Sequence, residues 1–409
     1  MATRPEVIDL TDVDMFVRDE HHDAFSWLRA NDPVYLNRTV DGDAFWALTR
    51  YRDVVSAYGD HTTFSSSGGA MLGGSFRNET DTASGRMLVA SDPPRHRLLR
   101  QIMHQVFSPA TGERVQEHVR SLVEKALSRM EKNGGADFAT DVAPELPAGA
   151  LMAIMGVSYE EAHHLIGLTR RMLGYRDPAF GDLGSDERVR LAEIQAEIFE
   201  FFDDLVRSRR RAPGDDLIGV LLRARINARP LDDEEILYNC LNVAVGGNET
   251  SSYSACSGML ALLNDPAQLR LLWKTPDLVD SAVGEILRWS STNAYVQRVA
   301  LRDVEFAGKH IGAGDVVTLW NVSANRDEDV FPRADRFDIE RRPNRHLSYG
   351  SGIHRCIGAV FAQLELSILF RCLLDQGAAL ELAGEPERLR SNFILGITRL
   401  PIRLAGGGR

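Results

Sequence analysis

One cysteine of this chain lies in a stretch dense in glycine, and residues His346 to Gly358 read His-Leu-Ser-Tyr-Gly-Ser-Gly-Ile-His-Arg-Cys-Ile-Gly. A thiolate is a strong ligand for a metal ion, and glycine lets the backbone approach a flat ligand closely. An apolar helical pattern begins just after Cys356, so the positive helix end and its amides favour the ionised sulfur. The alternative is a small buried cysteine in a capping loop, the commoner role of an isolated cysteine. The loop predicts a metal thiolate at Cys356.

A second segment combines glycine with an acid and an alcohol. The pattern from Leu231 to Leu263 predicts one long helix, and Gly246-Gly247-Asn248-Glu249-Thr250-Ser251 lies near its middle. Each glycine inside a helix costs about 1 kcal/mol relative to alanine. The glycines therefore serve either close packing against another helix or space for a ligand beside this one. In the second case Glu249 and Thr250 are candidates for proton delivery.

Basic and paired charged residues form two further motifs. Asp92-Pro93-Pro94 predicts a helix start with an acidic N-cap and proline at the first position, continuing to Phe107. His96 and Arg100 are four residues apart on it, so they share a face and could hold a buried carboxylate or simply be solvated. Glu285 and Arg288 are three apart on another predicted helix and can pair, although such pairs are common on surfaces.

Taken in this order, the segments resemble the cytochrome P-450 family. The cysteine-loop pattern of that family is Phe-Gly-x-Gly-x-(His/Arg)-x-Cys-x-Gly. Its matches here are Gly350, Gly352, His354, Cys356 and Gly358, while Tyr349 stands where the family usually has phenylalanine. The glycine-rich helix segment is similar to the family's (Ala/Gly)-Gly-x-(Asp/Glu)-Thr motif. The His-x-x-x-Arg and Glu-x-x-Arg segments also have counterparts there.

The resemblance implies haem b as cofactor, with its iron bound by the Cys356 thiolate. Expected partners of the haem propionates are His96, Arg100, Arg298 and His354, and Tyr349, Gly350 and Gly358 are expected beside the cofactor. Thr250 and Glu249 are expected to assist protonation of oxygen. Glu285 and Arg288 are expected to form a buried structural pair with a third arginine, either Arg336 or Arg341. Candidate substrate contacts are Leu88, Val243, Gly247 and Asn293.

The implied activity is that of a soluble, bacterial-type haem-thiolate monooxygenase. It would insert one oxygen atom from O2 into a small organic substrate, free or carrier-bound, by hydroxylation or epoxidation in secondary metabolism. Oxidative coupling, desaturation and peroxygenation are the alternatives, and a non-enzymatic haem sensor is a lesser one. Electrons are expected from a ferredoxin and its reductase. A basic rim near the cysteine would attract that acidic partner; its members are Arg95, Arg97, Arg100, Arg345 and Arg355.

Composition excludes several other classes of protein. The 409 residues carry 47 basic and 58 acidic side chains, a net charge of −11, which disfavours nucleic acid as a partner. The four cysteines are too scattered for a zinc cluster or a disulfide framework. Met1 to Asp23 contains no apolar run suited to a signal peptide or a membrane span. We expect a cytoplasmic monomer without membrane attachment.

The predicted fold is mainly α with a minor antiparallel β region, in a single domain from Met1 to Arg409. Strands are expected at 33–36, 44–48, 296–299, 304–306 and 316–319 and within 393–404, and a helix at 357–374. Helices also dominate 111–222, where 159–211 resembles the family's roof over the substrate. The loop from Ser65 to Gly85 is either a surface connection or a mobile lid.

Overall fold

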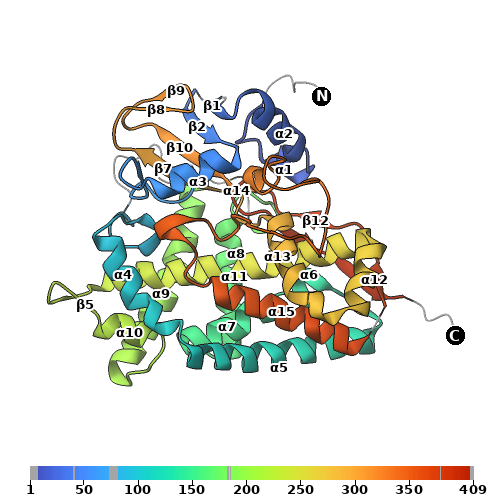
Figure 1. The fold of residues 1–409 in the computed structure, drawn as a ribbon. Helices are drawn as coiled ribbons and strands as arrows, with labels where there is room; N and C mark the ends of the chain where they lie inside the picture. The colour runs from blue at the N-terminus through green and yellow to red at the C-terminus, as the bar shows by residue number, and fades with distance from the viewer. Residues whose placement is uncertain are drawn as a thin grey trace.

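Helices form most of the protein, as predicted (Figure 1). The computed structural model describes residues 8–39, 42–72, 82–181, 184, 186–377 and 379–405. The α-helices are α1 Val13–Val17, α2 His21–Asn31, α3 Tyr51–Gly59, α4 Arg95–Met103, α5 Pro109–Asn133, α6 Phe138–Asp141, α7 Glu145–Met155, α8 Tyr159–Leu173, α9 Glu187–Arg211, α10 Leu217–Arg223, α11 Asp233–Asn264, α12 Pro266–Lys274, α13 Val279–Ser290, α14 Asn321–Ala324 and α15 Ala359–Gln376. Short 3-10 helices are η1 Leu88–Ala90, η2 His104–Val106, η3 Pro276–Leu278 and η4 Gly352–His354.

The largest sheet lies on one side of the helices in Figure 1, at the top of the view. The strands are β1 Val34–Arg38, β2 Ala44–Leu48, β3 Phe64–Ser65, β4 Gly135–Asp137, β5 Arg225–Ile226, β6 Arg229–Pro230, β7 Tyr295–Ala300, β8 Val304–Phe306, β9 Lys309–Ile311, β10 Val316–Trp320, β11 Leu380–Leu382, β12 Glu387–Arg388, β13 Ile397–Arg399 and β14 Pro401–Leu404. The largest sheet has the order β1-β2-β10-β7-β3. Its ladders are antiparallel except β2 with β10, which is parallel with Val317 opposite Trp46. The β region is therefore minor and mostly, not wholly, antiparallel.

The long helix α11 crosses the middle of the molecule and begins two residues later than expected (Figure 1). Asp232 caps it in a capping box, since its side chain accepts from the Glu235 backbone and the Glu235 side chain accepts from the Asp232 backbone. The helices α5, α7 and α15 pack with it around the main core. Gly149 of α7 is required there, because a Cβ at this position would lie 2.7 Å from the Val119 nitrogen.

The prediction of an Asp92 helix cap was wrong. The helix α4 begins only at Arg95, and Pro94, at the cap position, makes no side-chain cap hydrogen bond. The Asp92 carboxylate instead accepts hydrogen bonds from the Ser66 backbone at 3.0 Å and from the Ser65 hydroxyl. It thereby fixes the start of the glycine-rich loop. Residues 73–81, the middle of the predicted lid, lie outside the described residues.

The Glu285 carboxylate is the centre of a buried charge cluster. Arg288 donates to it from Nε at 2.8 Å and from Nη2 at 2.7 Å, and both side chains are fully buried. Arg341 is the third arginine, since its Nε lies 3.1 Å from Glu285 Oε2. Arg336 contributes only its backbone carbonyl, which accepts from Arg288 and Arg341. The third arginine of the cluster is therefore Arg341 and not Arg336.

The cluster continues toward the cysteine loop through hydrogen bonds. Asn344 Nδ2 donates to Glu285 Oε2 at 3.1 Å, and the Leu347 backbone donates to Asn325 Oδ1 at 2.6 Å. The Ser348 hydroxyl donates to the Leu287 carbonyl at 2.6 Å. The chain that precedes Cys356 is therefore fastened to α13.

Within the described residues, no single helix is both long and apolar enough to cross a membrane. One sharply bent pair, Phe138–Met155 with Tyr159–Leu173, reaches the required length and composition only when taken together.

Replacing Arg288 by alanine should destabilise the protein strongly. The change leaves the Glu285 charge buried without its main partner, which costs about 3–5 kcal/mol of unfolding free energy. Arg120→Ala is the matched control, because Arg120 pairs with Glu124 at 3.8 Å on the surface of α5 and should change stability by less than about 0.5 kcal/mol. Chemical denaturation of the variants measures both values. If both variants lost the same free energy of unfolding, the buried cluster would contribute no more to stability than a surface ion pair.

Candidate active site

The loop around Cys356 is shaped by glycines in left-handed conformations. Gly350 has φ +65° and Gly352 has φ +67°, and a Cβ on Gly352 would lie 2.5 Å from the Tyr58 carbonyl oxygen. The Cys356 backbone donates to the Tyr349 carbonyl at 2.8 Å, which closes the turn before α15 begins at Ala359. The Cys356 side chain is exposed, whereas the cysteines at 240, 256 and 372 are buried. The thiol can therefore reach a ligand.

The protein around Cys356 acts on the pKa of its thiol in both directions. Desolvation by surrounding protein raises its pKa, while the Gly358 backbone and the charges of Arg100 and Arg355 act in the opposite direction. The expected amides are present, but desolvation is the larger effect. A metal cation at the sulfur would supply the missing stabilisation of the thiolate.

Two imidazoles lie beside this loop. The rings of His96, on α4, and His354, in η4, are 4.1 Å apart between centroids. His354 Nε2 lies 3.0 Å from the Ser66 hydroxyl, whereas Nε2 of the buried His96 has no hydrogen-bond partner among the described residues. Burial lowers the pKa of His96 to about 4, so the ring is neutral and can donate only one N–H. His96 is therefore a buried donor or acceptor in need of a ligand.

Two arginines complete the basic group. Arg298, on β7, is only 4% exposed and donates to the Gln297 carbonyl at 2.6 Å, but no described carboxylate pairs with it. Burial lowers its pKa, while Tyr58 and Asp92 act in the opposite direction. A carboxylate ligand would stabilise this buried cation. Arg100 Nη2 donates to the Arg355 carbonyl at 2.7 Å, next to the cysteine. A cavity of about 990 Å³ is lined by His96, Arg100 and Gly352. These groups fit a cofactor that carries carboxylates.

The glycines of α11 leave space. A Cβ on Gly246 or Gly247 would meet no atom within 4 Å, so close helix packing does not explain them. The Thr250 hydroxyl donates to the Gly246 carbonyl at 2.9 Å and is partly exposed. Since these glycines and Thr250 are spaced by about one helical turn, they share one open face of α11.

Glu249 does not share that face. It is fully buried, and its Oε2 accepts from Arg170 Nε at 3.1 Å, across to α8. Burial raises the Glu249 pKa, while Arg170 acts in the opposite direction. Asn248 also bonds α8, through the Thr169 hydroxyl at 3.0 Å. Sequence reasoning placed the acid and the alcohol together and missed Arg170, because nothing in the sequence signals a partner 79 residues away.

Tyr349 and Gly358 both lie close to the cysteine. The Tyr349 hydroxyl makes no hydrogen bond to a described protein atom, so neither the Cys356 sulfur nor a backbone carbonyl is its partner. Burial raises its pKa, with Cys356 and Glu365 acting in the same direction. A Cβ on Gly358 would lie 3.6 Å from the Phe107 ring, an ordinary contact. The protein itself therefore does not require glycine there.

The candidate substrate residues differ in their surroundings. Leu88, in η1, and Val243, on α11, are buried, while Gly247 is exposed. Asn293 is partly buried, and its Oδ1 accepts from Asn321 Nδ2 at 3.3 Å, so its amide already has a protein partner. Asn239, which sequence reasoning missed, accepts from the Leu88 backbone at 3.0 Å and so ties η1 to α11.

Comparison with known proteins places this geometry in a family. The sequence model of the cytochrome P-450 family matches residues 13–271 and 276–388. Linalool 8-monooxygenase of Pseudomonas putida is 32% identical over 403 residues, covering 97% of this chain and 98% of that protein. The crystal structure of the P-450 OxyD, involved in the biosynthesis of vancomycin-type antibiotics, has a TM-score of 0.87 at 32% identity and covers 98% of this chain and 100% of that one.

A third relative is the P-450 BioI, whose structure is a complex with acyl carrier protein ligated to hexadec-9Z-enoic acid. Its TM-score is 0.83 at 28% identity, with 96% of this chain and 100% of that chain covered. Because the family model spans most of the sequence and these relatives match nearly its whole length, the chain belongs to the cytochrome P-450 family of oxidoreductases, which bind haem b (iron protoporphyrin IX).

Proposed function

We propose that this protein is a monooxygenase that inserts one oxygen atom from O2 into a small organic substrate, by hydroxylation or epoxidation. Haem bound through a thiolate supplies the chemistry of oxygen activation. The observation that carries the proposal is the exposed Cys356 thiol beside buried basic groups that have no described carboxylate partner, His96 and Arg298. A cofactor with one metal and two carboxylates answers both needs.

The residues divide into binding and proton-handling roles in this proposal. Cys356 binds the iron, and His96, Arg100, Arg298 and His354 hold the propionates by charge and hydrogen bonding. Thr250 holds a proton or water at the open face of α11. Glu249, which accepts from Arg170 on the buried side of α11, relays protons toward Thr250. Tyr349, Gly350 and Gly358 line the cofactor.

The relatives and the candidate contact residues support a small, largely apolar substrate of secondary metabolism. One relative is named for oxidation of linalool and another for antibiotic biosynthesis, which supports secondary metabolism as the setting. The acyl carrier protein bound to a third supports a carrier-bound substrate as one form. Leu88 and Val243 would contact its apolar part, Gly247 would give it room, and Asn293 would offer a polar contact. A cytoplasmic location and a monomeric state stay predictions.

Replacing Cys356 by serine should abolish the thiolate signature and leave the protein folded. A hydroxyl is similar in volume to a thiol but is a poor iron ligand at neutral pH. The reduced, CO-bound absorbance spectrum of the haem-loaded variant measures the change. Cys372→Ser is the matched control, because Cys372 is buried in α15 and should keep the signature. A Cys356→Ser protein with the parent spectrum would remove the assignment.

Replacing Tyr349 by phenylalanine should leave the haem reduction potential and the reduced-CO band close to those of the parent. The hydroxyl makes no hydrogen bond to Cys356 in the described structure, so its loss withdraws no donor from the sulfur. A satisfied hydrogen bond contributes about 1 kcal/mol to the free energy of unfolding, and the loss in this variant should be smaller. Redox titration and denaturation test these points. A clear shift to more negative potential would contradict them, since it would mean that the hydroxyl stabilises the thiolate.

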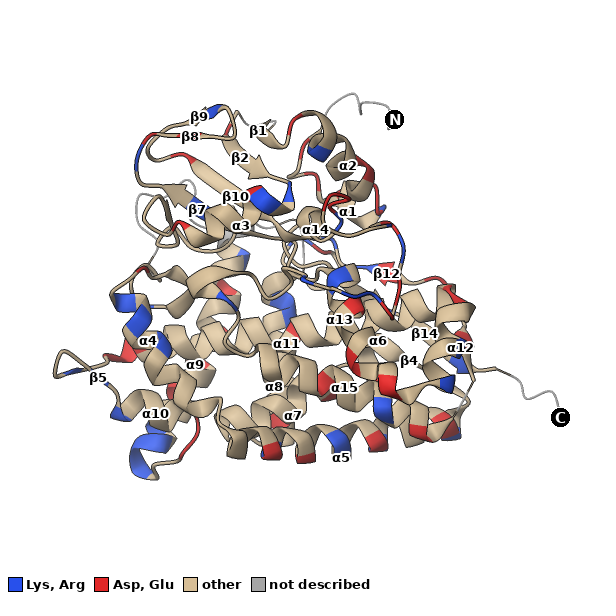
Figure 2. Ribbon diagram, in the orientation of Figure 1, with Lys and Arg blue, Asp and Glu red and all other residues tan. Residues whose placement is uncertain are grey.

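We infer a ferredoxin, with its reductase, as the electron donor, and the exposed arginines near the cysteine support this partner. Basic residues lie on α4 (Figure 2), and Arg97, Arg345 and Arg355 are exposed. Arg95 is not available to an acidic partner, because it is ion-paired to the buried Glu235. Arg100 is half-buried. The remaining exposed arginines give a smaller basic patch than the sequence predicted.

Reversing the charge of this patch should slow electron transfer. For Arg97→Glu combined with Arg355→Glu, the second-order rate constant with a ferredoxin should fall at least tenfold at low salt, and its dependence on ionic strength should weaken. Arg207→Glu on the exposed face of α9 is the control for net charge. Stopped-flow kinetics at several salt concentrations measures these rates. If the parent rate were insensitive to salt, steering by the patch would be wrong.

A further inference from the structure

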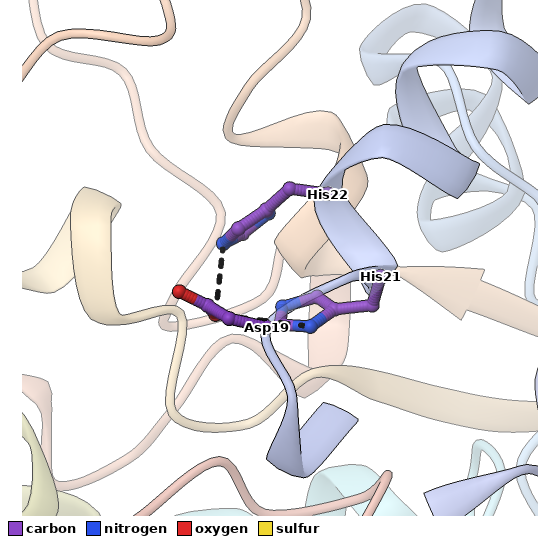
Figure 3. Close-up of side chains that lie close together, drawn as sticks. All are labelled: Asp19, His21 and His22. Carbon is purple, nitrogen blue, oxygen red and sulfur yellow. Dashed lines mark ion pairs between the residues drawn. The ribbon is translucent and has the colours of Figure 1, made fainter. Parts of the chain in front are cut away.

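A cluster of ligand atoms lies at the turn between α1 and α2, apart from the cysteine loop (Figure 3). The His21 Nδ1 atom is 3.9 Å from Asp19 Oδ1, and the His22 Nε2 atom is 3.8 Å from the same oxygen. All three ligand atoms lie within 4.8 Å of one another. One carboxylate and two imidazoles are a common ligand set for transition metals.

The backbone is bent to bring these groups together. Asp19 has φ +63°, a left-handed conformation that few residues other than glycine adopt and that aspartate and asparagine tolerate best. Its backbone donates to the Phe16 carbonyl at 3.2 Å. The tight turn directs the carboxylate back onto the first turn of α2. In Figure 3 both rings face the carboxylate.

His21 gives an independent indication that something binds here. Its side chain is almost completely buried, yet both ring nitrogens lack a hydrogen-bond partner among the described residues. The ring stacks on Phe16 at 4.8 Å between centroids and lies 4.1 Å from the His22 ring. A buried imidazole without partners is costly, and a ligand at Nδ1 removes that cost.

Protonation and access are both suited to a metal. The ordinary pKa of a histidine, about 6.5, leaves an imidazole mostly neutral near pH 7, and a neutral ring offers one nitrogen lone pair to a metal ion. The side chains of Asp19 and His22 are 46% and 24% exposed, which leaves an open side for water ligands. The three residues also line a cavity of about 810 Å³.

Nearby positive charges restrict which ion can bind. Arg388 Nη2 holds the second oxygen of Asp19 at 3.0 Å, Arg326 also lines the cavity, and the amino end of α2 is positive. These groups disfavour a hard cation held mainly by charge, such as Mg²⁺ or Ca²⁺. The same positive charges disfavour a transition-metal ion less, because its bonds to imidazole nitrogen do not depend on charge alone. The Arg388 contact also orients the carboxylate, as partners of metal ligands commonly do.

We propose that Asp19 Oδ1, His21 Nδ1 and His22 Nε2 bind a borderline transition-metal ion of the Zn²⁺ class, with water in the remaining position. Tetrahedral bonds of about 2.1 Å place ligand atoms about 3.4 Å apart. The two nitrogen-to-oxygen distances of 3.9 and 3.8 Å must therefore shorten by about 0.5 Å. The distance between the two imidazole nitrogens, which is at most 4.8 Å, must shorten by no more than about 1.4 Å. The bound ion would fasten the turn that carries Asp19 to the first turn of α2. This role does not depend on the haem chemistry.

The experiment measures binding of zinc chloride to the haem-loaded protein after chelator treatment, by calorimetry and by the shift in melting temperature. One added Zn²⁺ per chain should bind and raise the melting temperature of the parent. Asp19→Asn keeps the left-handed turn, His22→Gln keeps a polar side chain, and each should weaken zinc binding at least tenfold. His310→Gln is the control, because His310 is an exposed histidine 3.0 Å from Glu305 and should bind like the parent. An unchanged haem spectrum verifies that each variant is folded.

Two results would overturn the proposal. The first is equal zinc binding by the parent, Asp19→Asn and His22→Gln proteins, including no binding by any of them. The second is stabilisation by sodium phosphate but not by zinc chloride. In that case the cavity would be an anion site formed by Arg326 and the neighbouring basic groups.

Discussion

The buried carboxylate of Glu285 is the interaction on which the cysteine side of the molecule depends. It pairs with Arg288 and Arg341 and also accepts from the Asp338 backbone at 2.9 Å. Two guanidinium groups compensate one buried carboxylate, and their remaining N–H groups reach backbone carbonyls. Buried charges are tolerable only when satisfied in this way. Through Asn344 and the hydrogen bonds that follow, the cluster fixes the approach to Cys356.

The site itself has the opposite character, because its charged and polar groups are left incomplete. Arg298 is buried without a described carboxylate, and His96 has an unpaired nitrogen. Desolvation also raises the pKa of the Cys356 thiol. Carboxylates of a cofactor would pair with Arg298 and His96, and a metal cation would stabilise the Cys356 thiolate. The charges around Glu285 are therefore paired within the protein, whereas those around Cys356 are left for a ligand. The paired cluster holds the unpaired site in place.

Local patterns in the sequence predicted much of this, and long-range contacts were what it could not supply. Strand and helix patterns located β2, β8 and α11, and the glycine spacing located the cysteine turn. The sequence could not show that Arg170 reaches Glu249, that Asp92 turns to the serine loop, or that Arg341 joins Glu285. Those outcomes depend on which segments meet in three dimensions. The open face beside Gly246 was foreseeable only as one of two possibilities.

The central claim is that the Cys356 sulfur binds the haem iron. The most direct measurement is the resonance Raman spectrum of the ferric, haem-loaded protein prepared with cysteine carrying a heavy sulfur isotope. The account predicts an iron–sulfur stretching band that shifts to lower frequency with the label, because sulfur mass enters that vibration. A spectrum without any sulfur-sensitive band, or with a band sensitive instead to labelled histidine nitrogen, would contradict it.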